Sequence, residues 1–495
     1  MPLEPRISNP YRNAQQPRSI RHQLMPFICL ALASKASAQL FVGSFEDALV
    51  TPQFPLLGGI YQLTPGPATT QLNWLLSELA AGENTTAAEV NAHFSPTWLS
   101  QIPVANTISF IDSVRTNFQN AKVIDVISVT PMRITALIDT PNTGAPYGFL
   151  NFGSEYQGAG LIDLFGNSSF TSLQYLEDTT LSLPQAVAKF GTLAAQTGVF
   201  VGRINTANQC VSLQSSNQTA LFNTASIFKT WVLGGAARAV QNELLASANP
   251  IVLDGSKNVA GSVITSAPNG TVFNVGDLTT LMMGNSDNTA TDIMHQLAGR
   301  GRVDQIFTDF NMAQPNVMTP LLGISETFHL VYNVNSVNRN AYLSGSEAFQ
   351  QNFLQTDLIP RGRFTGGALS DNALLNTATW KATPLDICNA FAALRRFPEK
   401  STSLRLIDRA FASQAAQPFV RNQWDRVWYK GGSLASTSNN FHVLTHAWML
   451  EDQGRDPYVL VSMANDPAGN ILGNVNNFQI QSVNGRILQL LAEMP

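Results

Sequence analysis

A stretch of apolar residues near the middle of the 495-residue chain constrains the fold more than any other feature of the sequence. Residues Trp231–Val240 are rich in Ala, Leu and Val, and they have the length and content of a buried helix. The seven residues before them read Thr224-Ala-Ser-Ile-Phe-Lys-Thr230, and the hydroxyl of Thr224 is suited to cap the helix. We therefore expect a long helix that starts near Thr224 and lies in the core.

Ser226 and Lys229 lie three positions apart at the start of this helix, so one helical turn places both side chains on the same face. A serine hydroxyl becomes a nucleophile when a base is held against it. A lysine amine can be that base if burial and nearby positive dipoles disfavour its charged form. Among the few lysines of the chain, only Lys229 has a serine three residues before it. The alternative is a serine beside a helix cap and a lysine that reaches toward solvent.

A second motif with suitable chemistry is Ser286-Asp-Asn288, which precedes a helical stretch. A serine in a loop between helices can relay a proton between the lysine and a departing amine or alkoxide. The asparagine two residues on points the same way and can hold a substrate carbonyl. The alternative is a helix N-cap, a position that favours Ser, Asp and Asn alike.

A third motif is Trp428-Tyr-Lys-Gly-Gly-Ser433, which predicts a strand that ends in a lysine and two glycines. Lys430 would add positive potential for a substrate carboxylate, and the glycines let a ligand approach the backbone. The Ser433 N–H would then complete an oxyanion hole with the Ser226 N–H. The alternative is a strand that runs into a glycine turn.

Together, and in this order, the three motifs resemble those of the serine β-lactamase and penicillin-binding protein superfamily. The resemblance is greatest to its class A branch and covers residues 183–495. It implies an α+β fold in which an antiparallel sheet is flanked by helices beside an all-helical subdomain. It also implies a set of site residues: Ser226 as nucleophile, Lys229 as its base, Ser286 and Lys430 in catalysis, and Asn288, Gly432 and Ser433 in substrate binding.

The whole chain is similar to a narrower group of β-lactamase-like proteins, typified by one from clavulanic acid gene clusters and by mycobacterial lipoproteins. The similar segments are Ser286–Asp292, Pro320–Phe328 and Tyr429–Ser433. In that group a small α+β domain of the steroid-isomerase (NTF2-like) type precedes the lactamase domain. The resemblance therefore implies the same arrangement here.

Two positions depart from the class A pattern. Class A enzymes carry a Glu-x-x-Leu-Asn loop whose glutamate activates the deacylating water, and no such string lies between Asn288 and Lys430. Glu326 lies in the corresponding part of the chain as a possible deacylation carboxylate, although its neighbours differ. Gly431 replaces the usual Thr or Ser after the lysine, which removes a hydroxyl donor to a substrate carboxylate unless Ser433 substitutes. From the first departure we expect weak deacylation.

The N-terminal residues predict export. Residues 1–38 combine arginines, a short apolar run and Ala36-Ser-Ala38, a pattern typical of a signal peptide cleaved after Ala38. The protein is then secreted, in the periplasm or outside the cell, where Cys210 and Cys388 could form a disulfide, although the sequence does not place them close together. No later segment has about 18 uninterrupted apolar residues, so we expect no transmembrane helix.

The later patterns divide the chain into an α+β domain at 45–165, a linker at 166–182 and the catalytic domain at 183–495. In the first domain, helical periods, including a long one at Thr86–Gln101, precede alternating strand patterns. In the catalytic domain, strand patterns near both ends enclose a mainly helical insertion. Both ends should therefore contribute to one sheet.

Composition excludes several classes of function. A net charge of −4 provides no basic surface for nucleic acid. The six histidines and three cysteines show no metal-binding spacing, so we expect neither a metal nor another cofactor. The chain has no Gly-x-Ser-x-Gly motif, which disfavours an α/β-hydrolase.

These patterns predict a serine hydrolase of the β-lactamase type that acts through an acyl-enzyme on an amide or ester. Its substrate would be a small molecule such as a β-lactam, consistent with β-lactam breakdown, or a peptide-like compound. One alternative is a catalytically idle binding protein that keeps the fold and the pocket. The other is a D-alanyl-D-alanine peptidase or esterase.

Overall fold

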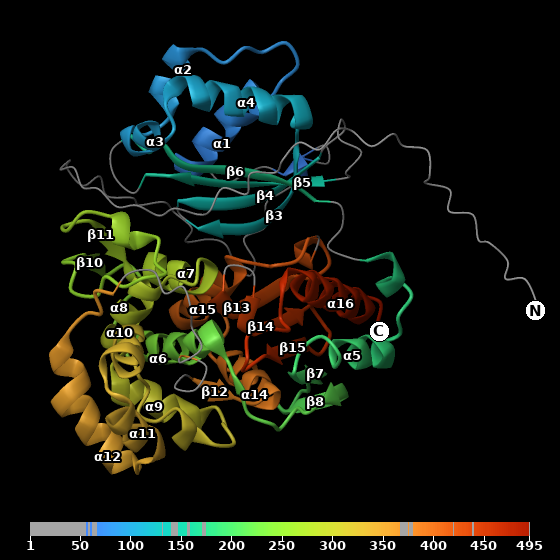
Figure 1. The fold of residues 1–495 in the computed structure, drawn as a ribbon. Coiled ribbons are helices and arrows are strands. Elements are labelled where there is room, and N and C mark those ends of the chain that lie inside the picture. Colours follow the sequence, from blue (N-terminus) through green and yellow to red (C-terminus); the bar gives the residue numbers. More distant parts are fainter. Residues whose placement is uncertain are drawn as a thin grey trace, which may run out of the picture.

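The computed structural model describes residues 56–57, 60–61, 67–130, 132–139, 147–155, 159–170, 175–366, 375, 380–418, 420–437 and 440–494. The predicted signal peptide lies outside the described residues. Two α+β units follow one another along the chain, and the smaller one lies above the larger one in Figure 1. None of the helices in the described ranges is long and apolar enough to cross a membrane.

The N-terminal unit is a four-stranded antiparallel sheet with helices on one face (Figure 1). Its helices are α1 (Pro67–Glu78), α2 (Ala87–His93), α3 (Pro96–Gln101) and α4 (Val104–Phe118). Its strands, in the order of the sheet, are β3 (Val123–Thr130), β4 (Arg133–Asp139), β5 (Tyr147–Ser154) and β6 (Ile162–Phe170), and a short hairpin of β1 (Leu56–Leu57) and β2 (Ile60–Tyr61) precedes the unit. Leu75, Ile111 and Phe152 are among the buried residues that join helices and sheet into one core. Strand β6 continues to Phe170 and so extends into the predicted linker.

The helix predicted at Thr86–Gln101 is two helices. Helix α2 ends at His93, and the hydroxyl of Ser95 accepts a hydrogen bond from the Trp98 N–H at 3.1 Å, which caps α3. Pro96 occupies the first position of α3, where a helix does not need a backbone N–H donor. Because proline lacks this donor, α2 cannot continue through it. The continuous apolar period therefore concealed a break.

The C-terminal unit contains a five-stranded antiparallel sheet. In order, its strands are β13 (Arg426–Thr437), β14 (Asn440–Glu451), β15 (Tyr458–Asn465), β7 (Gln196–Ile204) and β8 (Cys210–Ser216). Because β7 pairs with β15, the strands before and after the helical insertion share one sheet, which confirms that prediction. The prediction that the edge strand ends in Lys430 and the two glycines after it is wrong, since β13 continues past them to Thr437.

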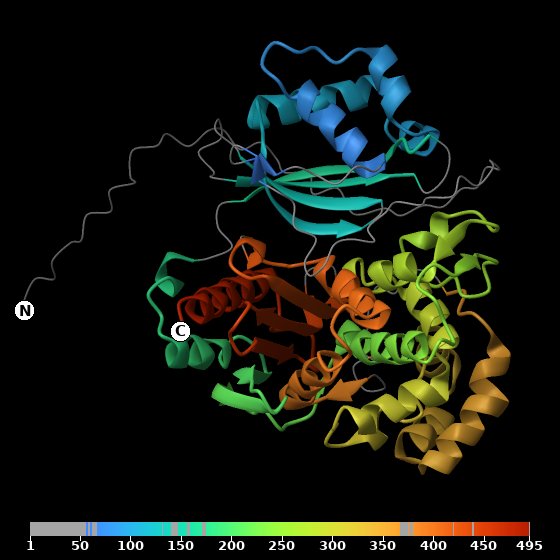
Figure 2. The ribbon, with the colours of Figure 1, turned by 180° about the vertical axis from the view of Figure 1, so that it is seen from behind.

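Helices cover both faces of this sheet (Figure 2). Helices α5 (Leu183–Phe190) and α16 (Asn474–Ala492) share a core with one face, while α14 (Pro384–Leu394) and α15 (Thr402–Ala412) pack on the other. Helix α6 (Lys229–Gln241) packs against both α14 and α15. Helices α7 (Val275–Gly284), α8 (Asn288–Ala298) and α9 (Arg300–Asp309) also pack against α6. Helix α10 (Ile324–Phe328) packs against α8, and α11 (Ser336–Ser344) packs against α12 (Glu347–Phe353) at the outer edge of the unit (Figure 1). Two short ladders join β9 (Phe222–Asn223) to β12 (Lys381–Ala382) and β10 (Pro250–Val252) to β11 (Val272–Asn274).

The central apolar helix begins later than the sequence predicts. Residues Ala225–Phe228 form a 3₁₀ turn, and the α-helix starts at Lys229. Thr224 does not cap it, because its hydroxyl lies 3.2 Å from the carbonyl oxygen of Trp380, which also accepts the Thr224 N–H. The prediction of a buried helix is confirmed, while the predicted cap is wrong because a residue distant in sequence offers Thr224 another partner.

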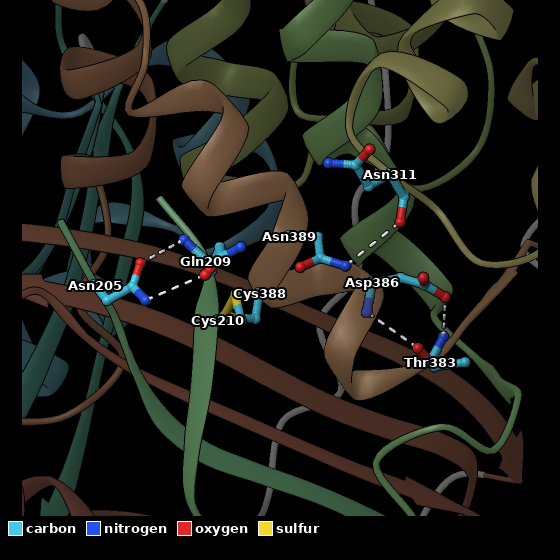
Figure 3. The surroundings of a disulfide bond; sticks show 8 residues. All are labelled: Asn205, Gln209, Cys210, Asn311, Thr383, Asp386, Cys388 and Asn389. Atoms are coloured by element: carbon cyan, nitrogen blue, oxygen red, sulfur yellow. Dashed lines mark hydrogen bonds between the residues drawn. A yellow bond between two sulfur atoms is a disulfide. The ribbon is translucent and has the colours of Figure 1, made fainter. Parts of the chain in front are cut away.

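A disulfide joins Cys210, at the start of β8, to Cys388 in α14, with 6.2 Å between the Cα atoms (Figure 3). Helix α14 begins with a capping box between Thr383 and Asp386, and the second oxygen of this carboxylate accepts the N–H of Ala313 at 2.7 Å. The disulfide therefore ties the edge of the sheet to a helix that is anchored at its start.

We expect the double variant C210A/C388A to unfold more easily than the wild type, by about 2–5 kcal/mol, because the disulfide restricts the unfolded chain over a long loop. Urea unfolding followed by circular dichroism, with and without reductant, measures the difference. Reductant should lower the midpoint of the wild type and leave that of the double variant unchanged. Equal midpoints for the two oxidised proteins would contradict this role.

Candidate active site

Ser226 lies in the 3₁₀ turn directly before α6 and is partly exposed. The residue before it, Ala225, has a φ of 44°, an unfavourable conformation for a residue with a Cβ. The turn is held from outside, since Trp380 accepts the Thr224 N–H at 3.0 Å and its ring stacks on that of Phe228 at 3.8 Å. Backbone strain that neighbours maintain in this way is common at functional sites.

Lys229 is fully buried one helical turn after Ser226. Its Nζ lies 2.5 Å from the carbonyl oxygen of Ser286, 3.2 Å from the Ser286 Oγ and 2.9 Å from the Asn288 Oδ1. Burial lowers the pKa of Lys229 to about 7, although the negative charges of Asp287 and Asp292 oppose the shift. At neutral pH a large fraction of this amine is therefore uncharged.

The Ser286–Asn288 loop contains both a helix N-cap and polar side chains directed at the lysines of the site. Asp287 is the N-cap of α8 and accepts the Ala290 N–H at 2.7 Å, while its other oxygen accepts the N–H groups of Val263 and Ile264. Ser286 has a φ of 56°, which turns its hydroxyl to the two lysines of the site. The cap thus positions the flanking serine and asparagine.

Lys430 reaches the same serine from β13. Its Nζ lies 3.0 Å from the Ser286 Oγ and 2.6 Å from the carbonyl oxygen of Gly431. Burial, and to a lesser degree the charge of Lys229, lower the pKa of Lys430 well below its usual value. The two amines converge on one hydroxyl, so protonation of one disfavours protonation of the other.

This arrangement can accommodate a neutral Lys229 and pass a proton. A neutral amine has two N–H groups and one lone pair, and the carbonyl oxygens of Ser286 and Asn288 can accept both N–H groups. Lys430 can donate to the Ser286 Oγ, which leaves the Ser286 O–H able to donate to the lone pair of Lys229. A continuous path for protons then links the two lysines through Ser286.

Strand β13 lies against the turn that carries Ser226. A Cβ on Gly432 would lie 2.5 Å from the Thr224 carbonyl oxygen and 2.8 Å from the Ser226 nitrogen. Thr445, the partner of Gly432 in β14, donates its hydroxyl to the Thr224 carbonyl at 2.9 Å. Only a residue without a side chain permits this approach. Thr445 belongs to no motif of the sequence, and only the register of β13 and β14 places it beside Gly432.

Gly431 has a local structural explanation. A Cβ at this position would overlap the hydroxyl of Tyr429, which lies 2.8 Å from the Nδ1 of His446 behind the strand. Gln481 contacts the other ring nitrogen of His446 at 3.2 Å, and burial lowers the pKa of this histidine to about 4. The neutral His446 and Tyr429 therefore occupy the space that a Thr or Ser side chain would need. Ser433, which lies on the same face of β13 as Gly431, is exposed.

Glu326 lies in α10, and both of its carboxylate oxygens have partners. One accepts the Gly323 N–H at 2.7 Å, and the other lies 2.6 Å from the Arg300 guanidinium. Nearby, Asp292 accepts the N–H groups of Ile324 and Ser325 and so braces the same segment. The structure thus assigns Glu326 a capping contact, and its part in deacylation stays a prediction.

No metal site accompanies these residues: in the described ranges, no three His, Cys, Asp or Glu side chains are grouped so that they could hold an ion. The structure brings together Ser226, Lys229, Ser286, Asn288, Lys430 and Gly432 from three separate segments of the chain.

The C-terminal unit combines a sheet that helices cover on both faces with two lysines that contact the Ser286 hydroxyl. The model of the family described as "Beta-lactamase enzyme family" matches residues 183–477, more than half of the chain. The chain belongs to the beta-lactamase enzyme family, which confirms the broader resemblance and the predicted α+β fold of this unit.

Solved structures similar to the chain include three bacterial β-lactamases. That of Chitinophaga pinensis DSM 2588 has 16% identity and a TM-score of 0.43, and the match covers 62% of this chain and 97% of that one. Those of Sphaerobacter thermophilus DSM 20745 and Francisella tularensis have 17% and 13% identity, each with a TM-score of 0.41. Their matches cover 63% and 62% of this chain, and 97% and 99% of theirs. No curated protein matches the sequence.

The close approach at Gly432 is testable. We expect G432A to unfold about 1–3 kcal/mol more easily than the wild type, because the added Cβ meets backbone atoms that cannot move away cheaply. Urea unfolding measures the change. The matched control is G166A in β6, where a Cβ meets no other atom within 4 Å. If G432A and G166A were equally stable, β13 would not be held against the Ser226 turn.

Proposed function

We propose that the chain is a serine hydrolase that forms an acyl-enzyme with an amide or ester, either a β-lactam or a peptide-like compound. The observation that carries the proposal is the fully buried Lys229, whose pKa of about 7 suits a general base at neutral pH. It lies one turn from Ser226 and contacts Ser286 directly. A buried lysine with only a structural role would also need polar partners, but it would not need a second lysine at the same serine hydroxyl.

In the proposed acylation step, the Ser286 O–H turns away from the lone pair of the Lys229 Nζ. The Ser226 Oγ then attacks the substrate carbonyl carbon and forms a C–O bond while its proton passes to this lone pair. The N–H groups of Ser226 and Ser433 stabilise the oxyanion, a role supported by the approach of Gly432 to the Ser226 nitrogen. When the C–N or C–O bond to the leaving group breaks, Ser286 passes the proton from Lys229 to the departing atom.

Two residues are proposed to bind the substrate. The Asn288 Nδ2 donates one N–H to the Ala260 carbonyl at 2.8 Å, and its second N–H can donate to a substrate carbonyl. Lys430 lies in the edge strand of the sheet, where its protonated form would favour a substrate carboxylate. Its lowered pKa means that an anionic substrate would draw a proton onto this amine as it binds.

We propose that deacylation is slow. Glu326 is the predicted carboxylate for this step, but its oxygens are engaged by Gly323 and Arg300. It would activate water only after the Arg300 contact opens. An acyl-enzyme that persists is typical of penicillin-binding proteins rather than of resistance enzymes.

We further propose that the N-terminal unit is of the NTF2-like type and that the protein is exported. Helices on one face of a four-stranded antiparallel sheet support the first proposal, together with the likeness to the clavulanic acid cluster protein. The Cys210–Cys388 disulfide supports the second, because such bonds persist in oxidising compartments.

A fluorescent penicillin should label the wild type and leave S226A unlabelled, because the acyl bond forms on the Ser226 Oγ. Gel fluorescence and intact mass measure the adduct, and burst kinetics with a chromogenic cephalosporin separate acylation from turnover. S344A is the control, since this exposed serine donates its hydroxyl to the Asn340 carbonyl within α11. Adducts of equal intensity on S226A, or none on the wild type with either a penicillin or a fluorophosphonate, would leave the binding-protein alternative.

The acylation rate should rise with pH through about 7 and level off above it, because Lys229 accepts a proton only in its neutral form and its pKa is lowered to that value. Stopped-flow acylation across this range measures the profile. K229R should acylate about 10²–10⁴-fold more slowly, since a guanidinium remains charged. An acylation rate that is constant across neutral pH would exclude Lys229 as the base.

A further inference from the structure

The two units of the chain are joined by a short backbone ladder. Strand β3 of the N-terminal unit pairs with the residues that follow α15: the Val129 N–H donates to the Ser413 carbonyl and the Ala415 N–H donates to the Ile127 carbonyl, both at 2.8 Å. Ser128 and Gln414 face each other as an antiparallel bridge. The four-stranded sheet of the N-terminal unit is therefore extended by a segment of the C-terminal unit.

One side chain from each unit strengthens this contact. Met132, from the N-terminal unit, is buried in the hydrophobic core that also contains Leu281 and Met282 of α7. Arg421, from the C-terminal unit, donates its Nε–H to the Val126 carbonyl at 3.0 Å. Main-chain hydrogen bonds, the buried Met132 side chain and the Arg421 guanidinium join the two units at this interface. We therefore expect the two units to move together there.

Gln414 links this interface to the candidate active site. Its backbone pairs with Ser128, while its side-chain Nε2 donates to the Gly284 carbonyl at 2.9 Å. Gly284 is the last residue of α7 and lies two residues before Ser286. A Cβ on Gly284 would overlap the Ser413 hydroxyl and lie 3.0 Å from the Thr130 Cγ2. Residues of both units thus enclose the end of α7.

We propose that Gln414 is a positioning residue for Ser286 and that β3 of the N-terminal unit is part of the active-site scaffold. Ser286 is held at a φ of 56°, a conformation that persists only when its surroundings enforce it. The Gln414 amide fixes the carbonyl at the end of α7, and β3 fixes Gln414. Ser286 is then held where both lysines reach its hydroxyl. This role in catalysis rests on the proposed function.

The variant Q414M tests the proposal, because methionine keeps the size of the side chain and removes the N–H donor. We expect acylation by a penicillin to slow about tenfold, the effect of losing one hydrogen bond that holds a reacting group, with the penicillin dissociation constant unchanged. The pH at which acylation is half-maximal should also shift, since Ser286 no longer lies at its place between the two lysines. Stopped-flow kinetics over a range of penicillin concentrations separate the two constants.

The matched control is Q350M in α12, where the glutamine Nε2 also donates to a backbone carbonyl, that of Tyr342, at 2.9 Å. Hydrogen–deuterium exchange of residues 281–288 is measured in parallel and does not depend on activity. Faster exchange and slower acylation in Q414M alone support the proposal. Wild-type exchange in Q414M, or equal slowing in both variants, overturns it. If the wild type forms no adduct, the proposed function fails, and exchange alone still decides whether Gln414 holds the loop.

Discussion

The site depends on an amine whose charged form the protein disfavours, so that the pKa of Lys229 is lowered to about 7. Lys229 is fully buried in the first turn of a helix whose other residues are mostly apolar. Burial disfavours its ammonium form by removing water, and the polar groups of Ser286 and Asn288 satisfy the N–H groups that remain. Lys430 at the same hydroxyl adds a second amine of lowered pKa. The local chemistry follows from this balance between desolvation and hydrogen bonding.

The surrounding fold keeps two unfavourable backbone conformations in place. Ala225 and Ser286 both have positive φ angles, and neither would hold that conformation alone. The turn at Ala225 is held by Trp380 and by the backbone at Gly432, from two distant parts of the chain. The loop at Ser286 is held by the cap of α8 and by Gln414 beneath α7. Packing therefore maintains the geometry that the proposed chemistry requires.

Much of the site could be predicted from the sequence because its chemistry needs particular side chains at short spacings. The order of strands and helices also predicted that both ends of the C-terminal unit contribute strands to one sheet. The predictions that failed were local ones that a distant partner decides. Thr224 bonds to Trp380 instead of capping a helix, and the strand at Lys430 continues because β14 pairs with it to its end. Pro96 favours the start of a new helix, but the apolar period continues on both sides of it and therefore predicted one helix instead of two.

The sequence by itself determined the identity and order of the reactive groups, since residue types and short spacings are properties of the chain. Only the tertiary structure decided their protonation and approach. The pKa of Lys229 depends on how completely the helices exclude water, and the contact of Gly432 with Ser226 depends on the register of β13. The pairing of Cys210 with Cys388 and the link through Gln414 join residues far apart in sequence. Such contacts arise from packing, which the spacing of residues along the chain does not encode.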